Sequence, residues 1–460
     1  MTTSGFTLSS PEIEACLQCL VPATIGSCAP DGTPNVTWVS IVYRLDESHI
    51  GLSRQFFRKT SSNMEVNRYL QVLFLHPHTG RQFRLNVQYE STDTDGPRFD
   101  YVRTMLDAIA SEGGMTKVFR LIGLDVCEVL SIEAVPSDSG APDALAAASA
   151  PLRQAGLAQR IGVFSESLNN ATDIEDLMGR ALAGLQTCFG YNRSFIMLVD
   201  ESGERLFTVA SRGYESSGAG SEVRMGEGQI GVSAQNRRPV LLSNVVKERL
   251  YTDAVRESVT RAGQADSLES EIALPGGAGQ VMSQLTVPLM ARGQLLGALV
   301  LQSDVAGRFV SEDEHIAVVA ATELGLSMAL LRLAPVIDVT PPSLTAAPRE
   351  NRPNADIRHY AADDSIFVDD QYLIKGIAGR ILWRLLRDYS EKQRVEFSNK
   401  EIRLDSSLEL PDIKDNLETR LILLRRRLED QCNFLRIVKT SRGRFRLSVD
   451  RPLSLQDVPV

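Results

Sequence analysis

Cysteine is scarce in this chain, with six residues in 460. That number is too small for a disulfide scaffold, and the N-terminus lacks the basic and then apolar segment of a secretory signal peptide. Both absences favour a reducing compartment, in which cysteines remain thiols. We therefore expect the protein in the cytoplasm.

Long apolar runs are also few. The most apolar helical segment, Ile316 to Ala334, contains Glu323 and Arg332 and follows an acidic cap. A membrane-spanning helix needs about 20 consecutive, predominantly apolar residues. We therefore interpret this segment as a helix that packs on protein, and predict no membrane association. The composition, 43% hydrophobic and 23% charged residues, is that of ordinary globular proteins.

The length of the chain exceeds what one hydrophobic core usually supports, and about 150 residues per domain predicts about three domains. Two segments have the composition of linkers: Pro136 to Ala150 is rich in Pro, Ser and Ala, and Ala334 to Asn354 is rich in Pro. The predicted domains are residues 1–135, 151–335 and 361–460, joined by linkers at 136–150 and 336–360.

Positive charge is concentrated in residues 415–447, although the whole chain has a formal net charge of −9. The first half has leucines at helical spacing and predicts a helix with one buried face. The second half alternates apolar and basic residues around Ser441-Arg442-Gly443 and predicts a hairpin with a basic tip. The apolar helix positions are Leu417, Leu421, Leu424 and Leu428, and the expected exposed side carries Thr419, Arg420, Arg425 and Arg427.

A helix followed by a basic hairpin is the arrangement of a winged helix, in which the helix enters the DNA major groove and the wing contacts phosphates. The sequence resembles the winged-helix output domain of two-component response regulators. TRLILLRRRLE is similar to the recognition helix and RIVKTSRGRFRL to the wing. IFVDDQYLIKGIAGRILWRLL is similar to the leading strands and first helix, and FSNKEIRLD to a second helix with Ser398 and Glu401 in capping-box spacing.

This resemblance implies double-stranded DNA as the partner. We predict base contacts from side chains with paired donors or acceptors and phosphate contacts from cations. The predicted groove residues are Asn416, Thr419 and Arg420, and the predicted phosphate residues are Arg425, Arg427, Lys439, Arg442 and Arg444. The alternative is a winged domain that binds protein, with Arg425 to Arg427 as a solvated charged face.

Residues 1–135 combine a short predicted helix with segments of period-two apolarity and tight turns, which favours a small antiparallel barrel. The helix is Pro11 to Leu20, and the strands are Ala23 to Cys28, Val36 to Leu45, His49 to Ser53 and Leu70 to His76. The run from Pro22 to Leu75 resembles the FMN-binding split barrel of the pyridoxamine phosphate oxidase superfamily.

The resemblance implies a flavin phosphate held at a basic strand-to-helix connection, because a buried dianion must be paired and hydrogen-bonded. The matching residues are Ser53, Arg54, Arg58, Lys59 and Asn63. The alternative is a barrel kept only for dimerisation.

Thiols and imidazoles give rival cofactors for the same region. Cys16 and Cys19 share one face of the predicted helix, and a closed barrel could bring Cys28 and Cys127 close to them. Such a set binds an iron–sulfur cluster or zinc, although four buried apolar cysteines give the same pattern. His76 and His78 are candidate haem ligands.

Residues 151–335 contain two helical stretches, two strands after Ser194 and the motifs VRMGEGQIGVSAQNRRPVLLSNV and SQLTVPLMARGQLLGALVLQS. The region resembles a GAF domain, a sensory module that holds a small molecule or serves as a dimer contact. Gly226, Gly228 and Gly231 permit a tight loop into a helix, and no P-loop lysine follows. Thr252 to Pro275 is either a ligand lid or a disordered insertion. The flanking helices of a GAF domain predict a parallel homodimer.

The predicted fold is therefore multidomain α+β, with an antiparallel split barrel, a GAF sensor domain and a C-terminal winged helix-turn-helix. There is no receiver-type acidic pocket, kinase motif or ATPase P-loop. We predict a cytoplasmic one-component transcriptional regulator without enzymatic activity, which responds to a redox or small-molecule signal. The alternatives are a flavin-dependent oxidoreductase regulated by its other domains, a metal or haem redox sensor, and a protein-binding adaptor.

Overall fold

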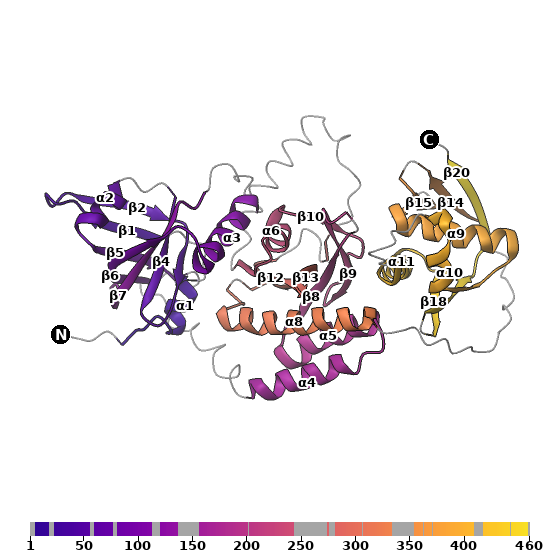
Figure 1. Cartoon of the computed structure of the whole chain (residues 1–460), viewed down its shortest axis with the longest axis horizontal. Coiled ribbons are helices and arrows are strands. Elements are labelled where there is room, and N and C mark those ends of the chain that lie inside the picture. Colours follow the sequence, from indigo (N-terminus) through magenta and orange to yellow (C-terminus); the bar gives the residue numbers. More distant parts are fainter. Residues whose placement is uncertain are drawn as a thin grey trace.

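The computed structural model has three regions in a row, which follow the order of the chain in Figure 1. It describes residues 5–17, 23–55, 59–76, 81–112, 120–136, 156–200, 202–242, 274–275, 281–305, 307–333, 354–361, 363–369, 371–408, 417–441 and 443–458. We refer to the three regions as the N-terminal, central and C-terminal domains.

In its described residues, the N-terminal domain is an antiparallel sheet of seven strands with three helices. Its sheet has the order β2-β1-β5-β6-β7-β4-β3. The strands are β1 (Ala23–Cys28), β2 (Pro34–Val39), β3 (Val42–Arg44), β4 (His49–Arg54), β5 (Tyr69–Leu75), β6 (Gln82–Asp93) and β7 (Gly123–Ala134), and the helices are α1 (Pro11–Leu17), α2 (Lys59–Val66) and α3 (Pro97–Glu112). Alternate residues of β1, such as Ala23 and Ile25, are buried in one core, as period-two apolarity predicts.

The sequence-based prediction of this domain was incomplete. The single strand expected from Val36 to Leu45 is two strands, because the chain bends at Ser40 between β2 and β3. The prediction also lacked α3 and the two longest strands, β6 and β7. Both strands contain bulges, and the register of β6 against β7 shifts twice, which interrupts the alternation that marks a strand in sequence.

The central domain is a six-stranded antiparallel sheet with helices on both faces (Figure 1). The sheet order is β10-β9-β8-β13-β12-β11. Its strands are β8 (Arg193–Val199), β9 (Arg205–Arg212), β10 (Glu222–Arg224), β11 (Val240–Leu242), β12 (Ser283–Ala291) and β13 (Gln294–Ser303), and its helices are α4 (Leu157–Asn169), α5 (Ile174–Phe189), α6 (Gly228–Asn236) and α8 (Ser311–Leu333). Helix α5 begins at Asp173, whose carboxylate accepts the N–H groups of Glu175 and Asp176.

Glycines shape the turn into α6, as the sequence predicted. Gly226 has φ +80°, a backbone conformation that side chains with a Cβ rarely adopt. A Cβ on Gly231 would lie 2.1 Å from the carbonyl oxygen of Arg224, so only glycine permits this close approach. The loop therefore serves local packing of α6 against β10.

Helix α8 is long and apolar enough to cross a membrane by length and composition, and among the described helices no other meets that test. It packs on the sheet of the central domain instead, with Ala317, Leu324 and Met328 buried there. A Cβ on Gly325 would lie 2.4 Å from the carbonyl oxygen of Met290, so the helix lies close against β12. No membrane protein is evident from this one helix, because a core helix of a globular domain has the same composition.

The C-terminal domain contains a three-helix core between two sheets. The strands are β14 (Ala355–Tyr360), β15 (Ser365–Val368), β16 (Gln371–Ile374), β17 (Glu396–Ser398), β18 (Leu435–Ser441), β19 (Arg444–Val449) and β20 (Leu453–Val458), and the helices are α9 (Gly376–Lys392), α10 (Asn399–Leu404) and α11 (Leu417–Gln431). The sheet orders are β16-β15-β14-β20 and β17-β19-β18. Because β14 lies within residues 336–360, the predicted second linker is too long: it ends before Ala355.

Two predicted details of this domain are confirmed. The expected basic hairpin is β18 and β19, which pair antiparallel next to Gly443 with φ +75°. Ser398 caps α10 and accepts the N–H of Glu401 at 3.2 Å. The Glu401 carboxylate does not complete a capping box in the described contacts, because it pairs with Arg394 at 2.6 Å.

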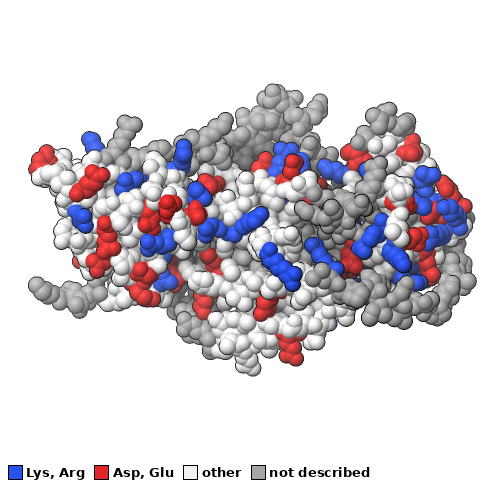
Figure 2. All heavy atoms as spheres, in the orientation of Figure 1, with Lys and Arg blue, Asp and Glu red and all other residues white. Residues whose placement is uncertain are grey.

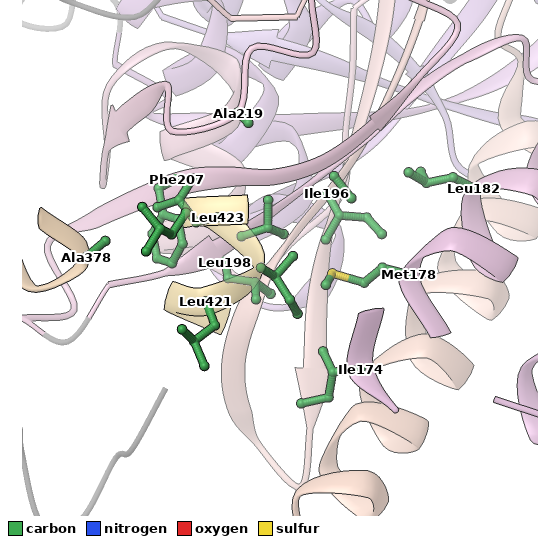
Figure 3. Close-up of a cluster of buried hydrophobic side chains, with 14 of the residues drawn as sticks. Ile174, Met178, Leu182, Ile196, Leu198, Phe207, Ala219, Ala378, Leu421 and Leu423 are labelled. Atoms are coloured by element: carbon green, nitrogen blue, oxygen red, sulfur yellow. The ribbon is translucent and has the colours of Figure 1, made fainter. Parts of the chain in front are cut away.

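Both outer domains pack on the central one. Helix α3 contacts α6 through Ala108 and Ile109, which join a cluster with Val232 and Val240. Helix α11 contacts α5 and β9, and Figure 3 shows its Leu421 and Leu423 beside Phe207 and Leu198 of the central sheet. The apolar core of the central domain is consequently continuous with that of the C-terminal domain.

Candidate functional site

The expected flavin site lies where β4 leads into α2. Three of its five predicted residues are held by internal contacts. Ser53 Oγ accepts the N–H of Ile41 at 3.0 Å, and Asn63 donates to Ser27 Oγ at 3.0 Å. Arg54 Nε and Nη2 donate to the two carboxylate oxygens of Asp125 at 3.0 and 2.5 Å. Asp125 is fully buried, so this bidentate ion pair neutralises a carboxylate inside the barrel.

Lys59 differs from these three, because it is exposed at the first position of α2. A helix start presents N–H groups to an anion, and a lysine there adds a charge. Arg58 lies outside the described residues. Among the described residues of the predicted site, Lys59 is therefore the one exposed cation that could bind a flavin phosphate, because Arg54 forms an ion pair with Asp125. Buried Gln55 has an Oε1 with no hydrogen-bond partner among the described residues.

Those of the predicted metal ligands that the structure describes do not form a metal-binding group. Cys16 and Cys127 are buried among apolar side chains of the barrel core, and Cys28 is partly exposed. Burial raises the pKa of the Cys127 thiol, which disfavours the thiolate that metals need. Among the described residues, no group of three or more His, Cys, Asp or Glu could hold a metal ion. Cys19 and His78 lie outside the described residues, and His76 follows β5.

The two faces of the central sheet are both filled in the described part of the domain. On the α6 face, Phe195, Met197 and Val300 pack against Ile230 and Ala234. On the opposite face, Leu177 and Leu185 of α5 belong to the main core. Most of the predicted lid, Thr252 to Pro275, lies outside the described residues.

The predicted DNA-contacting residues of α11 are placed against other parts of this chain. Thr419 is 1% exposed and Arg427 6% exposed, and the Arg427 Nε donates to the carbonyl oxygen of Leu373 at 2.9 Å. The guanidinium of Arg420 lies 4.7 Å from the ring centre of Phe207. Arg425 forms an ion pair with Glu175 of the central domain.

The hairpin makes a similar contact with the central domain. Lys439 pairs with Asp173, the residue that caps α5, and Arg444 lines the same junction. Ser217 of the central domain contacts Asp430 at the end of α11. Asn416 and Arg442 lie outside the described residues. Two of the basic residues predicted to bind DNA, Arg425 and Lys439, therefore pair with acidic residues of the central domain.

The expectation of an exposed cationic side on α11 was wrong. The helix is buried on two faces, because Leu424 and Leu428 pack in their own domain while Leu421 and Leu423 face the central sheet (Figure 3). The sequence did contain a sign of the second buried face, because Leu423 is apolar and lies outside the predicted apolar face. On the side of the molecule in Figure 2, Lys and Arg of the C-terminal domain alternate with Asp and Glu, so no continuous basic patch is visible there.

Comparison with protein families accounts for the first two domains. Residues 9–132 match the model of pyridoxamine 5'-phosphate oxidase. Residues 173–328 match the GAF domain model. The central domain is a GAF domain. The N-terminal domain is a split barrel like that of pyridoxamine 5'-phosphate oxidase, and together the two domains suggest a flavin-binding sensory protein. A search of curated proteins finds no match.

Several solved structures are similar to parts of the chain. The GAF domain of an Acinetobacter phosphoenolpyruvate-protein phosphotransferase is 19% identical, covers 38% of this chain and 95% of its own, and has a TM-score of 0.30. Free methionine-R-sulfoxide reductase from Neisseria meningitidis is 19% identical over 40% of this chain and 95% of its own, with a TM-score of 0.31. An FMN-binding protein from Syntrophomonas wolfei is 18% identical over 27% and 86%, with a TM-score of 0.24.

Sequence reasoning missed the residues that surround the predicted site. Asp125 lies 71 residues from Arg54 along the chain, and Asn35 donates to Thr60 Oγ1 at 3.0 Å at the base of α2. These partners lie on other strands, so residue spacing within the split-barrel motif gives no signal for them. The sole available clue was that a charged residue placed among strands needs a partner.

Proposed function

We propose that this protein is a cytoplasmic one-component transcriptional regulator, in which the split barrel and GAF domain sense a redox or small-molecule signal and a C-terminal winged helix binds double-stranded DNA. The observation that carries the proposal is the element order of the C-terminal domain. Strands β14 to β16 precede α9, α10 and α11, and the hairpin of β18 and β19 follows. This order matches helix-turn-helix proteins with a wing, and here it follows a sensory domain.

The contact between α11 and the GAF domain supports a closed form. Helix α11 cannot enter a major groove while Leu421 and Leu423 pack on the central sheet, because groove contacts need an exposed helix face. We infer that DNA binding requires α11 and the hairpin to separate from α5 and β9. A signal shifts that equilibrium only if it binds the open and closed forms with different affinities.

Two exposed apolar surfaces support a homodimer. On the GAF helices, Val163, Leu326 and Leu330 are 53%, 45% and 63% exposed. On the barrel, Val36 and Trp38 of β2 are 69% and 70% exposed. Apolar patches of this kind mark interfaces in proteins, and a two-fold dimer would present two winged helices to a two-fold DNA site.

A flavin in the barrel is part of the proposal, with Lys59 and the start of α2 as the described residues that would hold its phosphate. A bound flavin would supply a redox-active group. The absorption spectrum of freshly purified protein tests this directly, because flavin, haem and iron–sulfur centres have different bands. A flavin spectrum is expected; a spectrum without visible bands would remove the flavin from the proposal.

DNA binding is tested by selecting sequences from a random duplex library with the full-length protein, followed by gel-shift titration. Arg442→Ala with Arg444→Ala should weaken binding to every sequence and flatten its salt dependence, because wing arginines neutralise phosphates. Arg387→Ala serves as the control, since Arg387 pairs with Glu391 on the exposed side of α9. No enrichment in the selection, in the presence or absence of candidate signals, would favour a protein-binding adaptor.

The runner-up is a flavin-dependent oxidoreductase, which the barrel family favours. It predicts rapid turnover of a reductant by the yellow protein. Among the described residues of the predicted flavin site, Ser53, Arg54 and Asn63 are engaged in internal contacts, which leaves the exposed Lys59 as the one candidate for a general acid or base. We therefore favour the regulator.

A further inference from the structure

A cavity of about 270 Å³ lies at the junction of the barrel and the GAF domain. Its volume is just below the range of about 300–1,000 Å³ that is typical for small-molecule sites. The barrel contributes α1, β3 with the residues on either side of it, and α3. The GAF domain contributes Leu241 and the start of α8. The junction itself is well packed, with α3 held on the GAF domain by Asp100 and Arg238 at 3.2 Å and by Ser111 and the N–H of Gly228 at 2.7 Å.

Glu314, from the first turn of α8, gives this cavity a carboxyl group. Its Oε2 accepts a hydrogen bond from the Tyr101 hydroxyl at 2.7 Å. Among the described residues, the structure records no hydrogen bond to Oε1, and Glu314 lines the cavity. Burial raises the pKa of this carboxyl, so the Tyr101 hydrogen bond and His315 compensate its charged form only in part.

Two aromatic rings form the wall next to this carboxyl. The rings of Tyr43 and Tyr101 lie 4.8 Å apart between centres and are tilted by 35°. Leu17, Val102 and Met105 add apolar surface. Aromatic faces beside a carboxylate are the usual surroundings of an organic cation, which gains from both the ring quadrupole and the charge.

The remaining charged residues of the lining are mostly acidic. The carboxylate side chains are those of Glu14, Asp46, Glu47 and Glu314, and the basic side chains are those of Arg44 and His315. The guanidinium of Arg44 donates to Ser9 Oγ at 3.1 Å, and Ser9 Oγ donates to Glu47. The one arginine of the lining is therefore held by hydrogen bonds to neighbouring side chains. An anion would meet an excess of negative charge here, whereas a cation would balance it.

We propose that this junction cavity binds a small organic cation, an amine or quaternary ammonium compound with an apolar body, through Glu314 and the Tyr43–Tyr101 pair. The ligand would touch the barrel and the GAF domain at once, so its binding would stabilise their docked arrangement. This site is separate from the predicted flavin site at α2. Its occupancy is measured without DNA and does not depend on the proposed regulator.

The test uses full-length protein and three probes of nearly one shape in calorimetric titrations: phenethylamine, 2-phenylethanol and 3-phenylpropanoate. Phenethylamine should bind, and the neutral and anionic probes should bind at least roughly tenfold more weakly, since only the cation pairs with Glu314. Benzyltrimethylammonium is titrated as a second cation. Failure of both cations to bind would overturn the proposal, as would equal affinity for the alcohol.

Variants locate the binding. Glu314→Gln keeps the shape of the side chain and should weaken phenethylamine binding roughly tenfold. Glu312→Gln is the matched control, because Glu312 lies in the same helical turn but does not line the cavity. Ser40 lines the cavity, and Ser40→Phe should fill part of it without removing a charge. Binding that survives both Glu314→Gln and Ser40→Phe would place the cation elsewhere and reject the site.

Discussion

At the scale of residues, two carboxyl groups inside this protein have partners far away in sequence. Arg54 and Asp125 meet between β4 and β7, and Tyr101 and Glu314 meet between two domains. A buried ion pair contributes little net stability against an apolar substitute, but removing one partner leaves an uncompensated charge. The individual pairs can therefore be tested by single substitutions.

Asp125→Asn should destabilise the protein by about 3 kcal/mol, because it leaves the Arg54 guanidinium without its carboxylate inside the barrel. Urea unfolding followed by circular dichroism measures the change. Asp304→Asn is the control: Asp304 is 52% exposed and pairs with Arg193 at 3.4 Å, so its loss should cost less than about 1 kcal/mol. Similar losses for the two variants would contradict the structural role of Asp125.

Glu314 predicts a pH dependence of stability. Its pKa is raised by burial, against the lowering effects of the Tyr101 hydrogen bond and of His315. The folded state therefore holds the proton more tightly than the unfolded state. The stability contributed by protonated Glu314 is fully present below the pKa that this carboxyl has in the unfolded state. It is lost as the pH rises through the pKa that the carboxyl has in the folded state.

Glu314→Gln, which cannot ionise, should therefore raise Tm at pH 7.5 and leave it nearly unchanged at pH 4. Scanning calorimetry at both values, without added amine, measures this difference. The other titratable groups around this carboxyl are Tyr43, Tyr101 and His315, and the two tyrosine pKa values are raised, so neither ionises in this range. An equal gain at both pH values would mean that charge at Glu314 is not the cause.

At the scale of elements, α11 has two buried faces and so belongs to two domains at once. Its Arg425 pairs with Glu175 on α5, and its Arg420 lies over Phe207 on β9. These contacts keep α11 from binding DNA only while the C-terminal domain is packed against the GAF domain. Weakening the contact from the GAF side should leave α11 itself intact.

Glu175→Lys should strengthen DNA binding by about tenfold, the equivalent of about 1.4 kcal/mol, because repulsion from Arg425 replaces attraction. Gel-shift titration against a selected sequence gives the affinity. Glu166→Lys makes the same change of charge on the exposed side of α4 and should have a much smaller effect. If the two variants bind alike, the contact between α11 and α5 does not control DNA binding.

At the scale of the whole molecule, α4, α5 and α8 lie together on one face of the central sheet (Figure 1). Val319, Leu326 and Leu330 recur at helical spacing on α8 and are 40%, 45% and 63% exposed. An exposed apolar stripe of this length favours a helix-to-helix dimer contact.

Leu330→Lys should weaken the dimer at least tenfold, because it places a charge in that contact. Sedimentation equilibrium measures the dimer constant. Leu404→Lys provides the comparison, since Leu404 is 73% exposed on α10 in the C-terminal domain. A dimer that is equally stable in both variants would exclude the α8 surface as the interface.

The amino-acid sequence by itself determined the local features of this protein. Period-two apolarity located β1 and β5, the glycines before α6 marked a tight loop, and Ser398 marked the start of α10. These features depend on neighbours within a few residues, which the sequence displays directly. The two family resemblances of the first 335 residues are confirmed for the same reason, because their motifs are contiguous.

Only the tertiary structure decided what those elements contact. The sequence marked one buried face of α11, and the fold covered a second with the GAF domain. The sequence motif predicted Arg54 as a phosphate ligand, whereas in the fold Arg54 forms an ion pair with Asp125. No sequence pattern predicted a contact between Tyr101 and Glu314, which are 213 residues apart and share a hydrogen bond in the fold. Contacts of this kind depend on shape and charge between distant segments, which no local pattern encodes.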